Sequence, residues 1–295
     1  GPRSNKGTIM TRTLRLAIPN KGRLRDTTSS LLSDAGLDFE KSDRTLSVSV
    51  RNVDLDLLFV RTEDIAELVS DGTADLGITG QDLLAENGVD LPVLAELGYG
   101  HCRLVAAVPK ASLAEKLEDL AGTRVATAHP NATRRIFEER GIAADIVTLR
   151  GSVEVAPKLG VADAIVDLVS TGSTMLVNGL RQLDTILVSQ AVLIGSQTSL
   201  DSRSTEADAV VTALTAVTEG RRKRYLLLNA PSSSVGAIQR IIPGLGAPTV
   251  VPLADDTMVA VHSVVDAGSI WNLLPDLKAA GARDILVLRI EQLIP

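Results

Sequence analysis

Short aliphatic segments that alternate with longer amphipathic ones constrain the fold of this chain more than any other feature. Residues 14–18 and 124–127 are two such runs, and each is followed by a polar turn and then by residues with the apolar spacing of a helix. This alternation predicts an α/β fold with largely parallel sheets. The 295 residues are enough for two domains or three, and with only 2% aromatic residues their cores must be aliphatic.

Charge and cysteine content exclude several classes of function. With 30 Lys and Arg against 36 Asp and Glu, the net charge of −6 argues against a nucleic acid partner. No apolar run approaches the ~20 residues that span a bilayer, so we expect no membrane segment. The single cysteine, Cys102, excludes a disulfide framework and a cysteine-based zinc site. We therefore expect a cytoplasmic protein, and we leave residues 1–11, which resemble a cloning remnant, out of the fold.

The coarse secondary structure follows from these runs and from the turns between them. Strands are expected at residues 14–18, 53–60, 75–78, 104–108 and 124–127, and a further strand is expected to end near Asp167. Helices are expected at residues 23–35, 63–70, 81–86 and 133–140. One more helix is expected to begin near Thr174 and to bury Met175, Leu176, Leu180 and Leu183.

Two pairs of similar segments suggest two related lobes. Residues 17–23 and 127–134 both read as a strand, a Pro-Asn turn and a helix with basic residues. Residues 72–80 and 160–172 both begin with Gly-x-Ala-Asp and end with Thr-Gly. Because ligands bind beyond the carboxyl ends of parallel strands, we expect two α/β lobes that face each other across a cleft. Shared loop chemistry without a common origin is the alternative explanation of the likeness.

The order of predicted strands and helices changes after about residue 220. Strands at residues 225–228, 248–252, 258–264 and 284–290 and helices at 233–242 and 269–280 follow in the order βαββαβ. This order is that of the ferredoxin-like unit, which often serves as a ligand sensor. Because the arginine-rich residues 221–224 read as a hinge, we expect a separate C-terminal domain.

The segment around Asp167 carries the most specific chemical signal. An apolar strand delivers this carboxylate, and hydroxyl residues follow it around one glycine: Ser170, Thr171, Gly172, Ser173 and Thr174. Backbone N–H groups, hydroxyls and a helix N-terminus would form a phosphate cradle, while Asp167 would accept hydrogen bonds from sugar hydroxyls. The pattern therefore predicts a ribose-5-phosphate site. The alternative is a hydroxyl-rich cap that opens an ordinary helix.

Two further segments supply charges that suit the same site. Glu154, shortly after Gly151, adds a second carboxylate near the predicted ribose-5-phosphate site. The alternative is that it only stabilises a helix N-terminus. Across the expected cleft, a basic loop that suits a polyphosphate follows the first strand: Lys21, Gly22 and Arg23. Such a cluster is also typical of a solvated helix face. No Walker or GxGxxG sequence occurs, which disfavours P-loop and dinucleotide-binding functions.

These segments together resemble a known enzyme family. Residues 167–174, DLVSTGST, resemble the phosphoribosyl-pyrophosphate (PRPP) loop of the ATP phosphoribosyltransferases, the first enzymes of histidine biosynthesis. Residues 151–157, 100–104, 124–131 and 285–291 also look like this family. The resemblance runs from about residue 12 to the C-terminus. The extra C-terminal unit points to the long form, which needs no partner subunit.

The resemblance implies a reaction and an architecture. The family joins N1 of the adenine of ATP to C1 of PRPP and releases pyrophosphate, with Mg2+ required. A two-lobed periplasmic-binding-protein-like catalytic core and a ferredoxin-like domain that binds L-histidine as feedback inhibitor are implied, in dimers that assemble into hexamers. The implied boundaries are 12–105 with about 190–219 for lobe I, 106–189 for lobe II and 220–295 for the regulatory domain.

The resemblance also implies roles for single residues. Asp167 and Glu154 would hold the ribose hydroxyls of PRPP. The 5-phosphate would lie on the loop made of Ser170, Thr171, Gly172, Ser173 and Thr174. The phosphates or the nucleotide would face, from the other lobe, Lys21, Gly22 and Arg23. Histidine would bind at Asn229, Leu245 and Thr249. No metal ligand and no general base is identified.

Two other functions fit part of the pattern. A two-lobed solute-binding protein without catalysis would also place anion-binding loops around a cleft, but we expect it to carry a signal peptide or lipid anchor and no sensor domain. A different phosphoribosyltransferase would usually show two acidic residues in tandem before the phosphate loop, whereas only Asp167 stands there. We therefore expect an ATP phosphoribosyltransferase.

Overall fold

The computed structural model describes residues 12–40, 45–170 and 177–295, which divide into two compact units. The first unit extends to Val211, and the second consists of residues 34–36 and Thr212–Pro295. Thr171, Gly172, Ser173 and Thr174 of the expected phosphate loop lie outside the described residues. In the ranges given, no helix is long and apolar enough to cross a membrane.

The first lobe of unit one is built on a six-stranded sheet with the order β2-β3-β1-β4-β11-β5. Its strands are β1 (Leu14–Pro19), β2 (Ser47–Ser49), β3 (Leu55–Val60), β4 (Leu76–Gly80), β5 (Val93–Glu96) and β11 (Ala191–Gly195). Its helices are α1 (Arg25–Asp34), α2 (Ile65–Ser70), α3 (Gln81–Asn87) and α6 (Gln197–Ser202). β1, β3 and β4 run parallel, so their carboxyl ends meet at one edge.

The second lobe is built on a five-stranded sheet with the order β10-β6-β9-β7-β8. Its elements are β6 (Cys102–Pro109), β7 (Arg124–Thr127), α4 (Pro130–Glu139), β8 (Asp145–Thr148), η3 (Val153–Val155), β9 (Ala164–Val169) and β10 (Leu180–Ser189). Leu104 and Ala106 pack on one side of the sheet, while Val105 and Ala107 pack on the other. Burial on both faces explains why such strands read as continuous aliphatic runs.

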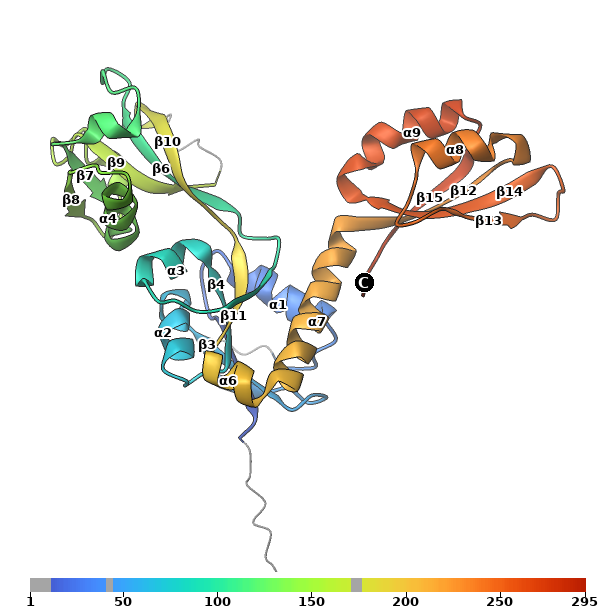
Figure 1. Cartoon of the computed structure of the whole chain (residues 1–295), viewed down its shortest axis with the longest axis horizontal. Coiled ribbons are helices and arrows are strands. Elements are labelled where there is room, and N and C mark those ends of the chain that lie inside the picture. Colours follow the sequence, from blue (N-terminus) through green and yellow to red (C-terminus); the bar gives the residue numbers. More distant parts are fainter. Residues whose placement is uncertain (1–11, 41–44, 171–176) are drawn as a thin grey trace, which may run out of the picture. The chain divides into compact units, whose positions relative to one another are not determined.

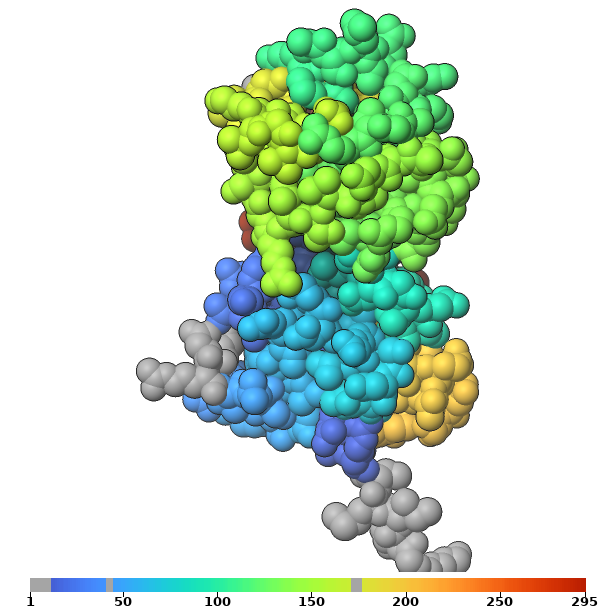
Figure 2. Space-filling model, turned by 90° about the vertical axis from the view of Figure 1, so that its left-hand side faces the viewer, coloured from blue at the N-terminus to red at the C-terminus, as the bar shows by residue number. Residues whose placement is uncertain are grey.

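The two sheets are the two lobes expected from the sequence. Both share one series of strand directions, β3-β1-β4-β11-β5 and β8-β7-β9-β6-β10, in which only the fourth strand, β11 or β6, runs antiparallel to the others. The chain passes between the sheets twice, from β5 to β6 and from β10 to β11 (Figure 1). In Figure 2 the first lobe is coloured mainly blue to cyan and the second mainly green to yellow-green. The expectation of a two-lobed periplasmic-binding-protein-like core is confirmed.

The two Gly-x-Ala-Asp segments make the same hydrogen bonds in both lobes. Asp75 N–H donates to Arg15 O at 3.0 Å, and Arg15 N–H donates to the Asp75 carboxylate at 2.8 Å. Asp163 N–H donates to Arg124 O at 2.8 Å, and Arg124 N–H donates to the Asp163 carboxylate at 2.9 Å. Each aspartate thus fastens two neighbouring parallel strands at the edge opposite their carboxyl ends, which gives the likeness in the sequence a structural cause.

The second unit contains the expected βαββαβ order. After α7 (Ser204–Arg222), its elements are β12 (Lys223–Pro231), α8 (Val235–Ile241), β13 (Thr249–Pro252), β14 (Met258–Asp266), α9 (Ile270–Ala279) and β15 (Arg283–Arg289). The antiparallel sheet has the order β13-β14-β12-β15. Leu226 and Leu228 pack with Ile238 of α8 and Leu277 of α9, which cover one face of the sheet (Figure 1). The ferredoxin-like domain is confirmed.

Two sequence-based expectations about local structure are wrong. The helix expected to begin near Thr174 does not reach Leu180, where β10 begins directly after Gly179, which has a φ of 70°. The arginine-rich residues 221–224 do not form a hinge, because α7 continues to Arg222 and β12 begins at Lys223. In addition, all of β6 belongs to the second sheet, so this sheet includes residues 102–105, which the expected bounds assign to the first lobe.

Candidate active site

Asp167 lies at the carboxyl end of β9, on the edge of the second sheet where a ligand is expected. Val166 is opposite Thr127 of the parallel strand β7, so Asp167 and the loop after Thr127 lie at the same edge. Leu168 N–H donates to Asp167 Oδ1 at 2.8 Å. Burial raises the pKa of Asp167, and the charge of Glu154 raises it further, while the Leu168 hydrogen bond and His129 oppose the shift.

Glu154 reaches this site from the short 3-10 turn η3. The buried side chains of Val153 and Ala156 anchor the turn in the core, and Glu154 stands half-buried between them. Ser152, just before the turn, has a φ of 52°, which is uncommon for a residue other than glycine and is often found at functional sites. Val153 and Ala156 pack in the same cluster as β9, and the charge of Glu154 raises the pKa of Asp167, so the two predicted carboxylates lie on neighbouring elements of one lobe.

The end of β9 leads directly into the expected phosphate loop. Ser170, the last residue described before residues 171–176, is exposed. Two carboxylates of like charge close together are costly unless hydrogen-bond donors or positive charge approach them. This edge of the second lobe therefore suits a ligand that offers hydroxyl groups.

The basic loop of the first lobe follows β1 at the carboxyl edge of its sheet. Lys21 is exposed, and Gly22 has a φ of 83°, a conformation that favours glycine. Arg23 Nη2 lies 3.2 Å from Asp82 Oδ1, and Arg23 Nη1 donates to the carbonyl of Gly100. Arg23 is thus held in one direction by protein groups, although part of its side chain remains exposed.

The two lobes touch through helices α3 and α4. The carboxylate of Glu86 in α3 accepts the N–H groups of Asn131 at 3.1 Å and Ala132 at 2.8 Å, at the N-terminus of α4. Arg135 in α4 donates to the carbonyl of Ala85. A carboxylate at a helix N-terminus satisfies donors that have no partner within the helix. Glu86 therefore caps a helix that belongs to the other lobe.

Three residues near the site have no assigned role in the sequence analysis. His129, at the N-cap of α4, is 9% exposed, and its buried Nδ1 has no hydrogen-bond partner in the described part of the chain. Asp82 and Ser189, which are 107 residues apart in sequence, hydrogen-bond each other. The spacing of residues in the sequence gives no signal for such a pair, while His129 could have been noticed because it shares the strand-turn pattern of the first lobe.

The three residues expected to bind histidine lie in the second unit. Asn229 alternates with the buried Leu228 and Ala230, so its side chain is on the sheet face opposite the helices, and its Nδ2 donates to Asp284 at 3.3 Å. Thr249 pairs with His262 of β14, next to the buried Val261, and is therefore on the same face. Leu245 is exposed between α8 and β13. Asn229 and Thr249 thus share one face.

Comparison with known proteins gives a consistent picture for both units. A family model described as ATP phosphoribosyltransferase (HisG) matches residues 61–216, and a model of the HisG C-terminal domain matches residues 220–292. An ATP phosphoribosyltransferase of Gemmatimonas aurantiaca is 47% identical over 292 residues, which cover 96% of this chain and 100% of the relative. One of Methanosarcina acetivorans is 43% identical over 289 residues, with the same coverage.

A solved structure adds support for the first unit. In the ATP phosphoribosyl transferase (HisG:HisZ) complex from Thermotoga maritima, one chain is 32% identical, with a TM-score of 0.62 over 70% of this chain and 98% of that one. The relatives match nearly the whole length, and the two family models cover both units in order. This chain therefore belongs to the ATP phosphoribosyltransferase family, whose members catalyse the first step of histidine biosynthesis.

Proposed function

We propose that this chain is a long-form ATP phosphoribosyltransferase (EC 2.4.2.17) in which Asp167 and Glu154 bind the ribose of PRPP. It joins N1 of the adenine of ATP to C1 of PRPP and releases pyrophosphate. The observation that carries the proposal is the partly buried carboxylate of Asp167, which stands shortly before residues 170–174 and whose pKa is raised by burial and by the charge of the partly buried Glu154. A cluster of this kind at the carboxyl edge of a sheet is where an α/β protein binds its ligand.

The chemistry needs little from the protein beyond placement and charge. Displacement at an anomeric carbon passes through an oxocarbenium-like state, whose positive charge nearby carboxylates stabilise. Asp167 and Glu154 hold the ribose hydroxyls, and because they are partly buried their charges act more strongly there than they would in water. Holding two bound substrates in line supplies much of the remaining acceleration.

Phosphate groups bind on both lobes in this proposal. The 5-phosphate of PRPP lies on the loop of Ser170, Thr171, Gly172, Ser173 and Thr174. The pyrophosphate group or the nucleotide is faced by Lys21, Gly22 and Arg23. The exposed ammonium of Lys21 and the partly exposed guanidinium of Arg23 support this assignment, since both residues follow the carboxyl end of β1.

Mg2+ enters in this proposal as the complex with PRPP. Within the described ranges, no group of three or more His, Cys, Asp or Glu side chains could hold a metal ion by itself. Mg2+ usually keeps several waters and binds substrate phosphates rather than a protein cage, so the residues present fit a substrate-borne ion. On the pyrophosphate group, the ion would neutralise charge that develops as this group leaves.

The second unit is proposed to act as a histidine sensor. The Thermotoga maritima protein is a complex with HisZ, whereas this chain carries a ferredoxin-like unit of its own. We assign histidine binding to Asn229, Leu245 and Thr249, and the long form assembles from homodimers to hexamers in the cytoplasm. The proposed division is 12–105 with about 190–219, 106–189, and 220–295.

Calorimetric titration with PRPP tests the ribose site. PRPP should bind the parent protein and should bind Glu154→Gln at least tenfold more weakly, because a charged hydrogen-bond acceptor is lost. The control is Asp163→Asn, at the other end of β9, which should bind PRPP as the parent does. Equal affinity of Glu154→Gln and the parent would remove Glu154 from the site. Binding of PRPP without any conversion of ATP would favour a solute-binding protein instead.

A further inference from the structure

The two connections between the lobes lie side by side and are fastened to each other. We call residues 97–101, between β5 and β6, together with Gln190, between β10 and β11, the hinge. Ala191 N–H donates to Tyr99 O at 2.9 Å, and Gly98 N–H donates to Gln190 Oε1 at 3.1 Å. A change in the angle between the lobes must bend this segment, because no other connection among the described strands joins the two sheets.

A buried carboxylate stands beside the hinge. Asp82, at the start of α3, is 1% exposed. The hydroxyl of Ser189, the last residue of β10, donates to Asp82 Oδ1 at 2.6 Å and accepts the N–H of Asp82 at 3.0 Å. Ser189 is itself fully buried, with an exposure of 0%. This reciprocal pair joins the first lobe to a strand of the second lobe.

Arg23 supplies the positive charge that this carboxylate needs. Its Nη2 lies 3.2 and 3.4 Å from the two oxygens of Asp82, and its Nη1 donates to the carbonyl of Gly100 in the hinge. Gly100 has a φ of 64°, and a Cβ there would collide with the side chain of Leu24. The Arg23 side chain is still 32% exposed, so part of its guanidinium, which has five N–H donors, remains open to a ligand.

We propose that Asp82 and Ser189 are positioning residues, which hold Arg23 against the hinge so that its orientation follows the angle between the lobes. Bending of the hinge that moves Ser189 away from Asp82 frees the Asp82 carboxylate. The guanidinium of Arg23 then loses the contact that fixes its direction. A closed arrangement restores both contacts and presents the remaining N–H groups of Arg23 to a phosphate. The inference rests on the proposed role of Arg23 at the phosphates.

A double-mutant cycle of Arg23→Ala and Asp82→Asn tests whether Asp82 acts through Arg23. The asparagine keeps an oxygen for the Ser189 hydroxyl but loses the charge that aims Arg23. Each single variant should lower kcat/KM at least tenfold, mainly by raising KM for the substrate whose phosphates Arg23 faces. The double variant should match Arg23→Ala within twofold. Effects that multiply would overturn the proposal, since independent residues give additive free energies.

Ser189→Ala extends the test with a gentler change. It removes the hydroxyl that fixes Asp82, and it should raise the same KM by about three- to tenfold, whatever the folding yield of Asp82→Asn. Unchanged KM values for Ser189→Ala in a folded protein would overturn the proposal. Arg23→Lys should recover only part of the efficiency lost in Arg23→Ala, because a single ammonium nitrogen lacks the planar fork whose separate nitrogens contact Asp82 and Gly100.

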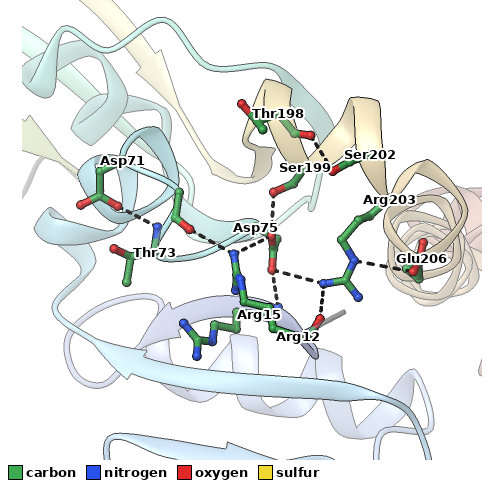
Figure 3. A network of polar contacts seen from close by, with 11 residues as sticks. Arg12, Arg15, Asp71, Thr73, Asp75, Thr198, Ser199, Ser202, Arg203 and Glu206 are labelled. Atoms are coloured by element: carbon green, nitrogen blue, oxygen red, sulfur yellow. Dashed lines mark hydrogen bonds and ion pairs between the residues drawn. The ribbon is translucent and has the colours of Figure 1, made fainter. Parts of the chain in front are cut away.

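Asp75 provides a matched control in the same lobe (Figure 3). It is 2% exposed, accepts a serine hydroxyl at 2.6 Å from Ser199 and pairs with Arg12 at 3.0 Å, but it lies at the opposite end of β4. Asp75→Asn should therefore lower thermal stability as Asp82→Asn does, with kcat/KM within twofold of the parent. If both variants lose kcat/KM equally, the effect is one of general stability and the proposal fails.

The outcomes separate this inference from the proposed function. If Arg23→Ala lowers kcat/KM while Asp82→Asn and Ser189→Ala leave it unchanged, Arg23 retains its role and only the positioning proposal is wrong. If Arg23→Ala is itself normal, the assignment of Arg23 to the phosphates fails, and the positioning proposal falls with it.

Discussion

Replacing Asp167 by Asn should slow catalysis while it stabilises the free protein. The amide keeps an oxygen that can accept Leu168 N–H, now 2.8 Å from Asp167 Oδ1, so the end of β9 should fold as before. What is lost is the charge. A hydrogen bond from a ribose hydroxyl to a charged acceptor contributes about 1.5–3 kcal/mol, so kcat/KM should fall about 10- to 150-fold.

The raised pKa of Asp167 fixes the sign of the stability effect. Burial, and then Glu154, raise this pKa above its unfolded value, so between the two values the folded protein binds more protons than the unfolded chain. Stability is therefore lost as pH rises through the folded-state pKa. Asp167→Asn escapes this loss, so its Tm should exceed that of the parent at neutral pH, and the difference should vanish in acid.

Steady-state kinetics and thermal unfolding over a pH series check both effects. Asp163→Asn is the control, because it lies at the other end of the same strand and its pKa is lowered by hydrogen bonds from Arg124. Asp163→Asn should lower the free energy of unfolding by no more than about 1 kcal/mol. This loss should have the opposite pH dependence, since it appears above the unfolded pKa of Asp163 and disappears as the pH falls. An Asp167→Asn variant with parental kcat/KM, or with a lower Tm at neutral pH, would refute the reasoning.

Three further predictions concern other parts of the molecule. Glu86→Ala removes the cap of α4 and should lower the free energy of unfolding in urea by about 1 kcal/mol, whereas Glu86→Gln should retain part of this stabilisation. An unchanged free energy of unfolding would mean that water replaces the carboxylate. Gly77→Ala places a Cβ 2.6 Å from Ile65 Cγ2 and should lower the free energy of unfolding by about 1–3 kcal/mol. An unchanged urea midpoint would show that α2 can shift away from the sheet at little cost. Thr249→Ala should raise the histidine concentration for half-inhibition without slowing uninhibited turnover, and unaltered inhibition would place the histidine site elsewhere.

Much of the fold of the two lobes is predictable because their central strands are buried on both faces. The segment that forms β7 was expected at residues 124–127 and lies there, since its aliphatic run is bounded by polar turns. From Leu180 the sequence predicts a helix, because Leu180 and Leu183 fit helical spacing as well as a strand, but this segment forms β10. β10 pairs with β6 with two register irregularities, and this tertiary pairing decides the structure.

The candidate site was predictable where its residues are close in sequence. Asp167 follows its strand directly, and Glu154 is only 13 residues away, so both could be placed at one edge. The environment of Arg23 could not be predicted, because it depends on Asp82, 59 residues away, and on Gly100, 77 residues away. Such contacts arise from the packing of strands from both lobes at the hinge, and no local pattern encodes them.

The central claim is that this chain transfers the phosphoribosyl group of PRPP to N1 of ATP. The most direct measurement is an incubation of the full chain with ATP, PRPP and Mg2+, with pyrophosphate quantified and the nucleotide product identified by NMR. We predict one pyrophosphate for each product molecule, with C1 of the ribose bonded to N1 of the adenine, and no product when either substrate is omitted. Pyrophosphate release that does not require ATP, or a ribose bonded to another adenine nitrogen, would contradict the claim.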